Sequence, residues 1–307
     1  MTDPAHILRS RHLVLDCRLP VPGGAHVMGV LNVTPDSFSD GGRFLDPAAA
    51  VQHAGRMVAE GAGLIDIGGA SSRPRGNAYG AGATLVDTQE EMRRILPVIQ
   101  GVSASWPDVW ISVDTFRADV AEAALAAGAH MINDITALRF APELADVCAR
   151  HDAPLVLMHS VGMPGDMPHV VESTSVVETV RQELHDAAAQ ARKAGCRQLV
   201  LDPGFGFGKS HTNNFQLMAG VGTLLEEGLP VLVGVSRKSS IGWAARARES
   251  DPVVPPEDRL PGSLAAAGTA VRHGASIVRT HDVAATVQYL RVLDRTRHPA
   301  SHGEGPK

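Results

Sequence analysis

The chain has 307 residues, a formal net charge of -5 at pH 7 and a hydrophobic fraction of 44%. These values suit one large domain or two small ones with a packed core, and a negative charge without a basic stripe argues against nucleic-acid binding. No apolar run in the sequence is long enough to cross a membrane. Residues 1–12 lack the apolar region of a signal peptide, so we expect a cytoplasmic protein.

The cysteines are few and widely separated. Cys17, Cys148 and Cys196 are odd in number and show no close spacing, which supports neither a disulfide framework nor a zinc site. We predict three free thiols that pack in the interior.

Residues 1–25 form an N-terminal extension before the first regular repeat. Within it, residues 12–22 (HLVLDCRLPVP) have the pattern of a short hairpin or an extended segment. We expect this segment to close the floor of the domain that follows it.

Apolar runs that stop on a polar or charged residue then recur eight times. Short β-branched runs are typical of strands buried on both faces, as parallel sheets require, and helical patterns usually follow them here. The runs are 26–32, 64–69, 110–114, 131–134, 154–159, 198–202, 230–238 and 276–281. The sequence therefore predicts an α/β fold, a (β/α)8 TIM barrel over residues 26–296, which needs roughly 250 residues.

Several helix boundaries are marked in the sequence. Asp46 and Pro47 offer an N-cap and a proline in the first turn, a further helix is predicted near residues 87–100, and Asp282 can cap the last helix. Residues 297–307 are rich in Gly, Pro and Ser, and we predict a disordered tail.

Three connections are longer than a barrel needs. They are Thr34–Leu45, Ser71–Asp87 and Ser160–Thr174, each rich in Gly, Pro or Ser. Long loops in compact domains are usually functional covers or disordered segments. All three follow strands, so we predict mobile covers over the face where the strands end.

Catalytic residues of such barrels lie at the C-terminal ends of the strands. One aspartate at a strand end often only caps the next helix, but several polar groups around one mouth favour a site. The polar strand-end residues are Asn32, Asp114, Asp134, His159, Asp202, Lys238, Arg279 and His281.

The segment 202–210 (DPGFGFGKS) ends like a phosphate-binding loop but is not one. The first glycine of G-x-x-x-x-G-K-[ST] would fall on Pro203, and the dinucleotide pattern fails because position 209 is lysine. We therefore exclude an NTPase loop.

The segment 28–42 (MGVLNVTPDSFSDGG) places an amide and carboxylates where the first strand ends. The amide of Asn32 can bind a metal or an anion, and Asp36 and Asp40 lie on a loop that ends in two glycines, although turn formation alone would also favour these residues. The segment resembles the first motif of the dihydropteroate synthase family. The resemblance spans roughly residues 26–295 and continues in 66–74, 112–115, 132–135, 157–159, 201–209, 236–239 and 278–282.

The resemblance implies a reaction and its participants. Members of this family join a dihydropterin methyl diphosphate to p-aminobenzoate, which releases pyrophosphate and gives 7,8-dihydropteroate. The expected cofactor is Mg²⁺, the substrates are small molecules, and the expected assembly is a homodimer through the last helices.

Roles for individual residues follow from their chemistry and from the resemblance. A pterin ring has amine and ring N–H groups that need carboxylate or amide acceptors. We expect the pterin to be bound by Asp114, Asn133, Asp202 and Lys238, with Met158 and Phe207 against the ring, although either apolar side chain could simply belong to the core. The diphosphate and Mg²⁺ are expected at Asn32, Arg279 and His281, with Asn32 as the metal ligand; a structural Arg279–Asp282 ion pair is the alternative. The catalytic candidates are Asp40, Ser72, Arg73 and Lys238, and the arylamine would be framed by Phe38, Pro74, Lys238 and Ser239.

The second long loop departs from the family pattern. Ala70 stands where a glutamate is usual, Ser72 replaces a threonine, and Arg75 is inserted. Two alternatives therefore stay open: a pterin-binding paralogue without synthase activity, and a pterin-dependent methyltransferase.

Overall fold

The computed structural model describes residues 4–19, 21, 23–34, 46–70, 86–162 and 175–297. Most of the three long connections, and the tail beyond residue 297, lie outside these ranges, so the predictions of mobile covers and of a disordered tail are not tested. Helix α10 extends through Arg297, which we had placed in the tail.

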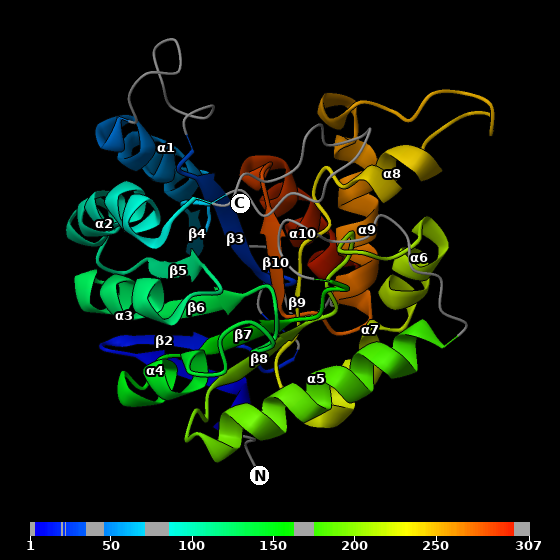
Figure 1. Ribbon diagram of the computed structural model, residues 1–307. Coiled ribbons are helices and arrows are strands. Elements are labelled where there is room, and N and C mark those ends of the chain that lie inside the picture. Colours follow the sequence, from blue (N-terminus) through cyan, green and yellow to red (C-terminus); the bar gives the residue numbers. More distant parts are fainter. Residues whose placement is uncertain are drawn as a thin grey trace, which may run out of the picture.

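Eight parallel strands form a nearly closed barrel, which confirms the predicted fold class (Figure 1). The strand order is β8-β7-β6-β5-β4-β3-β10-β9, and a single parallel bridge between Leu201 and Val231 links β8 to the segment before β9. The strands are β3 (His26–Asn32), β4 (Leu64–Gly68), β5 (Trp110–Asp114), β6 (Met131–Asp134), β7 (Leu155–Met158), β8 (Leu199–Asp202), β9 (Leu232–Val233) and β10 (Ile277–Thr280).

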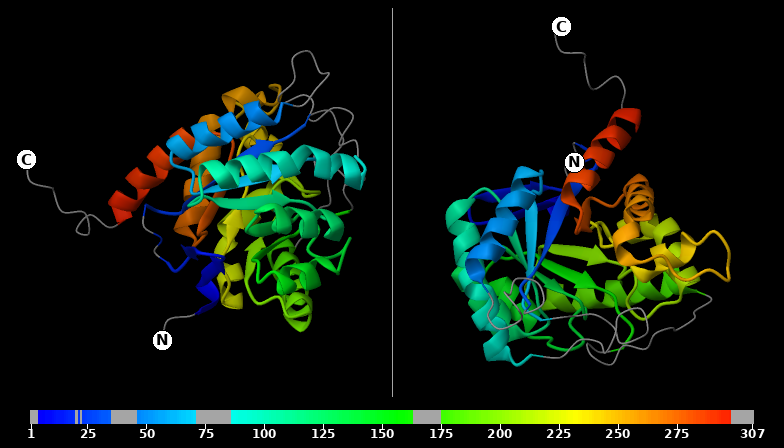
Figure 2. Two further views of the ribbon diagram at one scale, coloured as in Figure 1. Left: turned by 90° about the vertical axis from the view of Figure 1, so that its left-hand side faces the viewer. Right: turned by 90° about the horizontal axis from the view of Figure 1, so that it is seen from above.

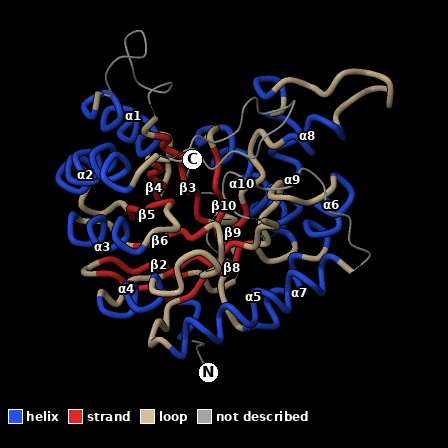
Figure 3. Tube along the Cα trace, viewed as in Figure 1, coloured by secondary structure: helices blue, strands red, loops and turns tan. Residues whose placement is uncertain are grey.

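Helices surround the strands on the outside (Figures 2 and 3). Viewed from above, α1 and α2 lie on one side of the sheet and α8 and α9 on the opposite side. The helices are α1 (Pro47–Ala59), α2 (Thr88–Ser105), α3 (Ala118–Ala127), α4 (Leu144–Arg150), α5 (Val176–Lys193), α6 (His211–Ala219), α7 (Val221–Leu224), α8 (Ser239–Ala244), α9 (Leu260–Arg272) and α10 (Val283–Arg297), with short 3-10 turns at Pro4–His6, Leu225–Glu227 and Pro256–Asp258.

Side-chain caps fix two of the predicted helix starts. The carboxylate of Asp46 accepts a hydrogen bond from the Ala48 amide at 2.9 Å, and that of Asp87 accepts one from Glu90 at 2.8 Å. Both satisfy amides that have no partner within the helix. Asp282 also directly precedes its helix, but its carboxylate binds the guanidinium of Arg237.

The seventh barrel strand is much shorter than predicted. We expected an extended run over 230–238, whereas β9 contains only Leu232 and Val233. The chain leaves the sheet in a turn in which Lys238 N donates to Val235 O at 3.3 Å and Arg237 has a φ of 58°. A left-handed residue cannot continue a strand, so the apolar pattern alone overestimates its length.

The floor of the barrel is apolar and is closed by an N-terminal hairpin. Strands β1 (Ile7–Ser10) and β2 (Leu13–Asp16) pair antiparallel, so the hairpin lies nearer the N-terminus than the predicted range 12–22. Each barrel strand adds one side chain to a buried cluster with the hairpin. Its members are Leu8, Leu13, Leu15, Cys17, Met28, Leu64, Trp110, Met131, Val156, Val200, Leu232 and Ile277.

Two residues after each of these barrel side chains, the inward-facing positions change from apolar to mostly polar. Side chains two apart point to the same face of a strand, so this second layer also faces the barrel interior. It consists of Val30, Asp66, Ser112, Asn133, Met158, Asp202, Gly234 and Arg279. The intervening residues, such as Ile65, Ile111 and Leu201, belong to the core beneath the helices.

The remaining predictions about composition are partly tested. Cys17, Cys148 and Cys196 are buried and free, as predicted. In the part of the chain that the structure describes, no helix is both long and apolar enough to span a membrane.

The hairpin offers a test of the apolar floor. Leu8 is fully buried in the floor cluster, so Leu8→Ala should lower the free energy of unfolding by about 2–5 kcal/mol. Val14 lies on the same hairpin with half of its surface exposed, and Val14→Ala should change stability by less than about 1 kcal/mol. Urea unfolding measures both; equal effects would show that the hairpin does not close the barrel.

Candidate active site

An arginine crosses the interior of the barrel and is held by two carboxylates. Arg279 on β10 donates from Nε to Asp66 Oδ2 on β4 at 2.6 Å and from Nη2 to Asp114 Oδ2 on β5 at 3.3 Å. Gly234, directly after β9, lies beside the Arg279 side chain: a Cβ there would be in ordinary contact with it, at 3.9 Å. Asp66 is fully buried, and such a charge is stable only when it is paired.

The next strands carry polar groups whose hydrogen-bonding capacity is incompletely used. Asn133 Nδ2 on β6 donates to Asp66 Oδ2 at 3.2 Å. Asp66 Oδ1, Ser112 Oγ and Asn133 Oδ1 are buried without a hydrogen-bond partner among the described residues. Buried polar atoms normally have partners, so this group of oxygens suits a ligand that brings N–H donors.

Across the barrel from Asp66 and Asp114, a lysine and an aspartate lie beside an apolar cluster, at the open end where the strands finish. Asp202 on β8 pairs with Met158 on β7, and its Oδ1 accepts from the Gly204 amide at 2.7 Å. Lys238 Nζ lies 3.9 Å from the centre of the Phe207 ring, a favourable cation–π contact. Phe207 packs on the cluster of Phe116, Ile135 and Met158.

Burial brings the charged groups of the mouth closer to neutrality. It raises the pKa of Asp202 to about 6, although the hydrogen bond from Gly204 and the charge of Lys238 act to lower it. It also raises the pKa of Asp114, although Arg279 opposes this. Burial and the charge of Arg279 lower the pKa of Lys238 to about 7, while Asp202 and Asp114 act in the opposite direction. Perturbed groups gathered at strand ends are typical of functional sites.

The remaining predicted residues within the described ranges lie around this centre. Asn32 ends β3 opposite Gly68, where a Cβ would lie 3.8 Å from Asn32 Oδ1 and 3.6 Å from Asp114 Cβ. His281 follows β10, and its Nδ1 lies 3.1 Å from Ser236 Oγ. Ser239 is the first residue of α8, directly after Lys238.

The structure does not test five predicted residues. Phe38, Asp40, Ser72, Arg73 and Pro74 lie outside the described residues. Their roles in catalysis and in framing the arylamine stay predictions.

Two strand-end residues make structural contacts: Asp134 with the turn that follows it, and His159 with helix α5. The Asp134 carboxylate accepts hydrogen bonds from Thr136 N, Thr136 Oγ1 and Leu138 N at 2.6–2.8 Å, so it stabilises the turn after β6. His159 Nε2 lies 3.1 Å from Glu183 on α5.

The alternative Arg279–Asp282 ion pair is wrong. Arg279 points into the barrel toward Asp66 and Asp114, while Asp282 binds Arg237. The two residues are separated by three positions at a strand end, where their side chains diverge.

Sequence reasoning assigned no role to Asp66, although it lies within a quoted motif. Its position carries a recognisable pattern: Leu64, Asp66 and Gly68 alternate with Ile65 and Ile67, so the charge must point inward. A lone carboxylate in the middle of an apolar strand requires a cation, and Arg279 provides it.

Lys209 has a structural role that the sequence does not reveal. Its ammonium is buried and donates to three backbone oxygens: His159 O at 3.1 Å, Gly204 O at 2.8 Å and Phe207 O at 3.2 Å. Burial lowers its pKa to about 7. The lysine therefore ties the loop after β8 to the end of β7.

Comparison with known proteins identifies the family. The pterin-binding enzyme family matches residues 28–281. This chain belongs to the pterin-binding enzymes. It is 42% identical to the dihydropteroate synthase of Escherichia coli K12 over 273 residues. The aligned region covers 88% of this chain and 91% of the Escherichia coli protein.

Solved structures of pterin-binding enzymes agree with this membership. The dihydropteroate synthase of Xanthomonas albilineans with 4-aminobenzoic acid has a TM-score of 0.82 and 44% identity, over 95% of this chain and 98% of that one. A complex of the same organism's enzyme with 7,8-dihydropteroate has a TM-score of 0.79 and 41% identity, over 95% and 99% of the two chains.

The Lys209 contacts predict a coupling between loop geometry and pterin binding. Lys209→Met keeps the length of the side chain but removes the ammonium donor from three carbonyls, of which Gly204 O and Phe207 O keep a backbone donor. The free energy of unfolding should therefore fall by about 1–3 kcal/mol. Pterin affinity should fall with it, because Phe207 and Gly204 lie in the same loop. Lys193→Met on the exposed end of α5 is the control; isothermal calorimetry showing equal pterin affinity in the two variants would contradict this role.

Proposed function

We propose that this chain is a dihydropteroate synthase. It would join a (7,8-dihydropterin-6-yl)methyl diphosphate to p-aminobenzoate and release pyrophosphate. Family membership and the ligands named for similar structures support this substrate class.

The observation that carries the proposal is the set of unpartnered oxygens on three adjacent strands. Asp66 Oδ1, Ser112 Oγ and Asn133 Oδ1 have no donor among the described residues. An unsatisfied buried acceptor costs about 1–3 kcal/mol, and a pterin ring has N–H groups that can satisfy such acceptors. Asp114, two residues after Ser112 on β5, and Asp202 on β8 add carboxylates at the strand ends.

The guanidinium of Arg279 suits the diphosphate. It is partly exposed toward the mouth, and its pairing with Asp66 holds it in one orientation before a ligand arrives. Arginine binds phosphate oxygens in forked geometry. His281 and Asn32, at the ends of neighbouring strands, complete the proposed anion site.

The mouth also fits a magnesium ion that is shared with the substrate. Mg²⁺ is commonly held by one or two protein oxygens together with substrate phosphates and water. Asn32 offers one amide oxygen, and the described residues contain no group of three His, Cys, Asp or Glu side chains that could hold a metal by themselves. When bound, the ion would supply positive charge to the leaving diphosphate.

The protein's part in the reaction is then positioning and charge neutralisation. The electron-rich pterin can stabilise positive charge on its methylene carbon, so a loose substitution requires no protein nucleophile. Phe207 and Met158 would lie against the pterin ring, and Lys238 and Ser239 would border the arylamine. Arg279 would stabilise the negative charge that develops on the leaving group.

A homodimer and a cytoplasmic location are further proposals. Val292 on α10 is a large hydrophobic residue with 59% of its surface exposed, which suits a partner at the last helices. Sedimentation of the purified protein tests the assembly.

Pyrophosphate release tests the proposed function. With the dihydropterin diphosphate and Mg²⁺, release should depend on p-aminobenzoate, and dihydropteroate should appear in equal amount. Pterin binding without dihydropteroate formation would favour the paralogue alternative, and would direct attention to the altered loop after Ala70.

Removal of Arg279 tests the role of the anion site. Arg279→Ala should lower kcat/KM by at least about a thousandfold, the upper range for one preorganised donor. Arg93→Ala on the exposed face of α2 removes the same charge and should leave turnover within about twofold. Near-normal turnover of Arg279→Ala would remove Arg279 from the diphosphate site.

A further inference from the structure

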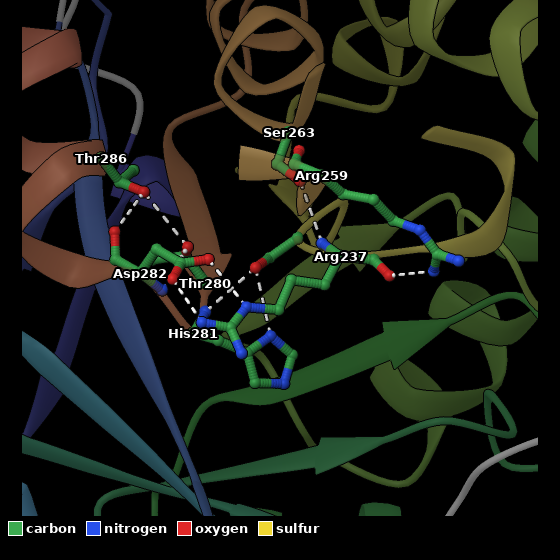
Figure 4. Close-up of polar contacts among 8 residues, drawn as sticks. Arg237, Arg259, Ser263, Thr280, His281, Asp282 and Thr286 are labelled. Atoms are coloured by element: carbon green, nitrogen blue, oxygen red, sulfur yellow. Dashed lines mark hydrogen bonds and ion pairs between the residues drawn. The ribbon is translucent and has the colours of Figure 1, made fainter. Parts of the chain in front are cut away.

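A polar cluster around Arg237 joins the segments that follow β9 and β10, and His281 is its only labelled member that the mechanism above uses (Figure 4). Arg237 lies between Ser236 and Lys238, and its φ of 58° is in the left-handed region. This conformation is unfavourable for a residue with a side chain. Such residues persist where the surroundings enforce them, and they gather at functional sites.

The backbone of Arg237 is held on both sides by the start of α9. Its amide donates to Ser263 Oγ at 3.0 Å, and its carbonyl accepts from Arg259 Nη1 at 2.8 Å. Arg259 is buried, and its Nε donates to Val254 O at 2.7 Å. The turn after β9 is therefore fixed against a rigid helix.

The side chain of Arg237 reaches across to the neighbouring strand end. Its Nε lies 3.0 Å from Asp282 Oδ2 and its Nη2 lies 2.5 Å from Asp282 Oδ1. Asp282 is itself held, because its amide donates to Thr280 Oγ1 at 3.1 Å and its carbonyl accepts from Thr286 Oγ1 at 2.8 Å. A bidentate pair between fixed partners restricts both distance and angle.

A second bond joins the same two strand ends. Ser236 Oγ accepts from the His281 amide at 3.2 Å and lies 3.1 Å from His281 Nδ1. The contacts Ser236–His281 and Arg237–Asp282 follow one another directly, in the segment after β9 and in the segment after β10. Lys238 immediately follows one side of this connection, and Arg279 precedes the other.

We propose that Arg237 and Asp282 are positioning residues. Their ion pair fixes the turn after β9 against the turn after β10, and so holds Lys238 in register with the anion site of Arg279 and His281. This inference rests on the proposed function, because it assigns the diphosphate to that site. The pair acts through its neighbours in sequence.

The direction in which Asp282→Asn changes pyrophosphate affinity distinguishes a positioning role from a simple charge effect. Asp282→Asn removes a negative charge beside the anion site, so Coulomb's law alone predicts tighter binding of pyrophosphate. If the carboxylate instead positions the site, the same substitution weakens binding. Arg237→Lys keeps the positive charge and removes the forked geometry, and positioning predicts weaker binding here as well.

The experiment measures pyrophosphate binding by calorimetry in the wild type, Asp282→Asn, Arg237→Lys and the double variant. We expect each single variant to bind about fivefold or more weakly, and the double variant to resemble the singles, because residues that act as a pair are not additive. Affinity for a dihydropterin without a diphosphate should fall less than affinity for pyrophosphate, because Lys238 is displaced while Asp114, Asn133 and Asp202 are unchanged.

Asp16→Asn is the matched control. Asp16 forms a forked pair with Arg18 beside the floor hairpin, with Arg18 Nε 2.8 and 3.1 Å from its two oxygens, and the Arg18 side chain is 43% exposed, as is that of Arg237. It should lose no pyrophosphate affinity. Thermal unfolding of every variant separates misfolding from a local effect, and Arg237→Lys gives the same test if Asp282→Asn does not fold.

The outcomes also separate this inference from the proposed function. Unchanged or tighter pyrophosphate binding by Asp282→Asn, together with unchanged binding by Arg237→Lys, would overturn the positioning role even if the wild type forms dihydropteroate. A wild type that forms none would overturn the proposed function, and the pyrophosphate comparison would still decide the positioning role.

Discussion

A guanidinium inside a barrel is stable only beside a carboxylate, and the pair Arg279–Asp66 meets this condition. The two groups lie on strands separated by β3, with Nε and Oδ2 2.6 Å apart. Removal of one partner from a buried pair leaves the other charge uncompensated, typically at a cost of about 3–5 kcal/mol. The same Asp66 oxygen accepts from Asn133. One carboxylate therefore sets the orientation of groups proposed to bind both halves of the pterin diphosphate.

This polar layer depends on the apolar layer beneath it. Each strand contributes one side chain to the floor cluster, and the N-terminal hairpin covers it from below. Water is excluded there, so the charges above are solvated from the mouth and by one another. Burial consequently raises the pKa of Asp202 and lowers that of Lys238. A ligand that brings N–H donors to Asp202, or negative charge to Lys238, would favour the charged form of each group.

The sequence was sufficient to predict the barrel, because its evidence is repeated in every unit. Eight apolar runs coincide with eight strands, and the structure confirms the helix start predicted at Asp46 and the helix predicted near residues 87–100. The length of β9 could not be predicted, because hydrophobicity does not reveal the left-handed turn at Arg237. The partners of Arg279 were also missed: a choice between Asp66 and Asp282 depends on which way a strand-end side chain points. Lys209 binds only backbone carbonyls, and no spacing of residue types in the sequence indicates such partners.

The most direct test of this account is to measure the binding of two ligands to the Asp66→Asn variant. Calorimetry would measure binding of a dihydropterin without a diphosphate and binding of pyrophosphate alone, each to folded protein. Because Asp66 holds both Asn133 and Arg279, the account predicts that both affinities fall by at least about tenfold, about 1.4 kcal/mol each. Wild-type affinity for either ligand would contradict the claim that one buried carboxylate organises both halves of the site.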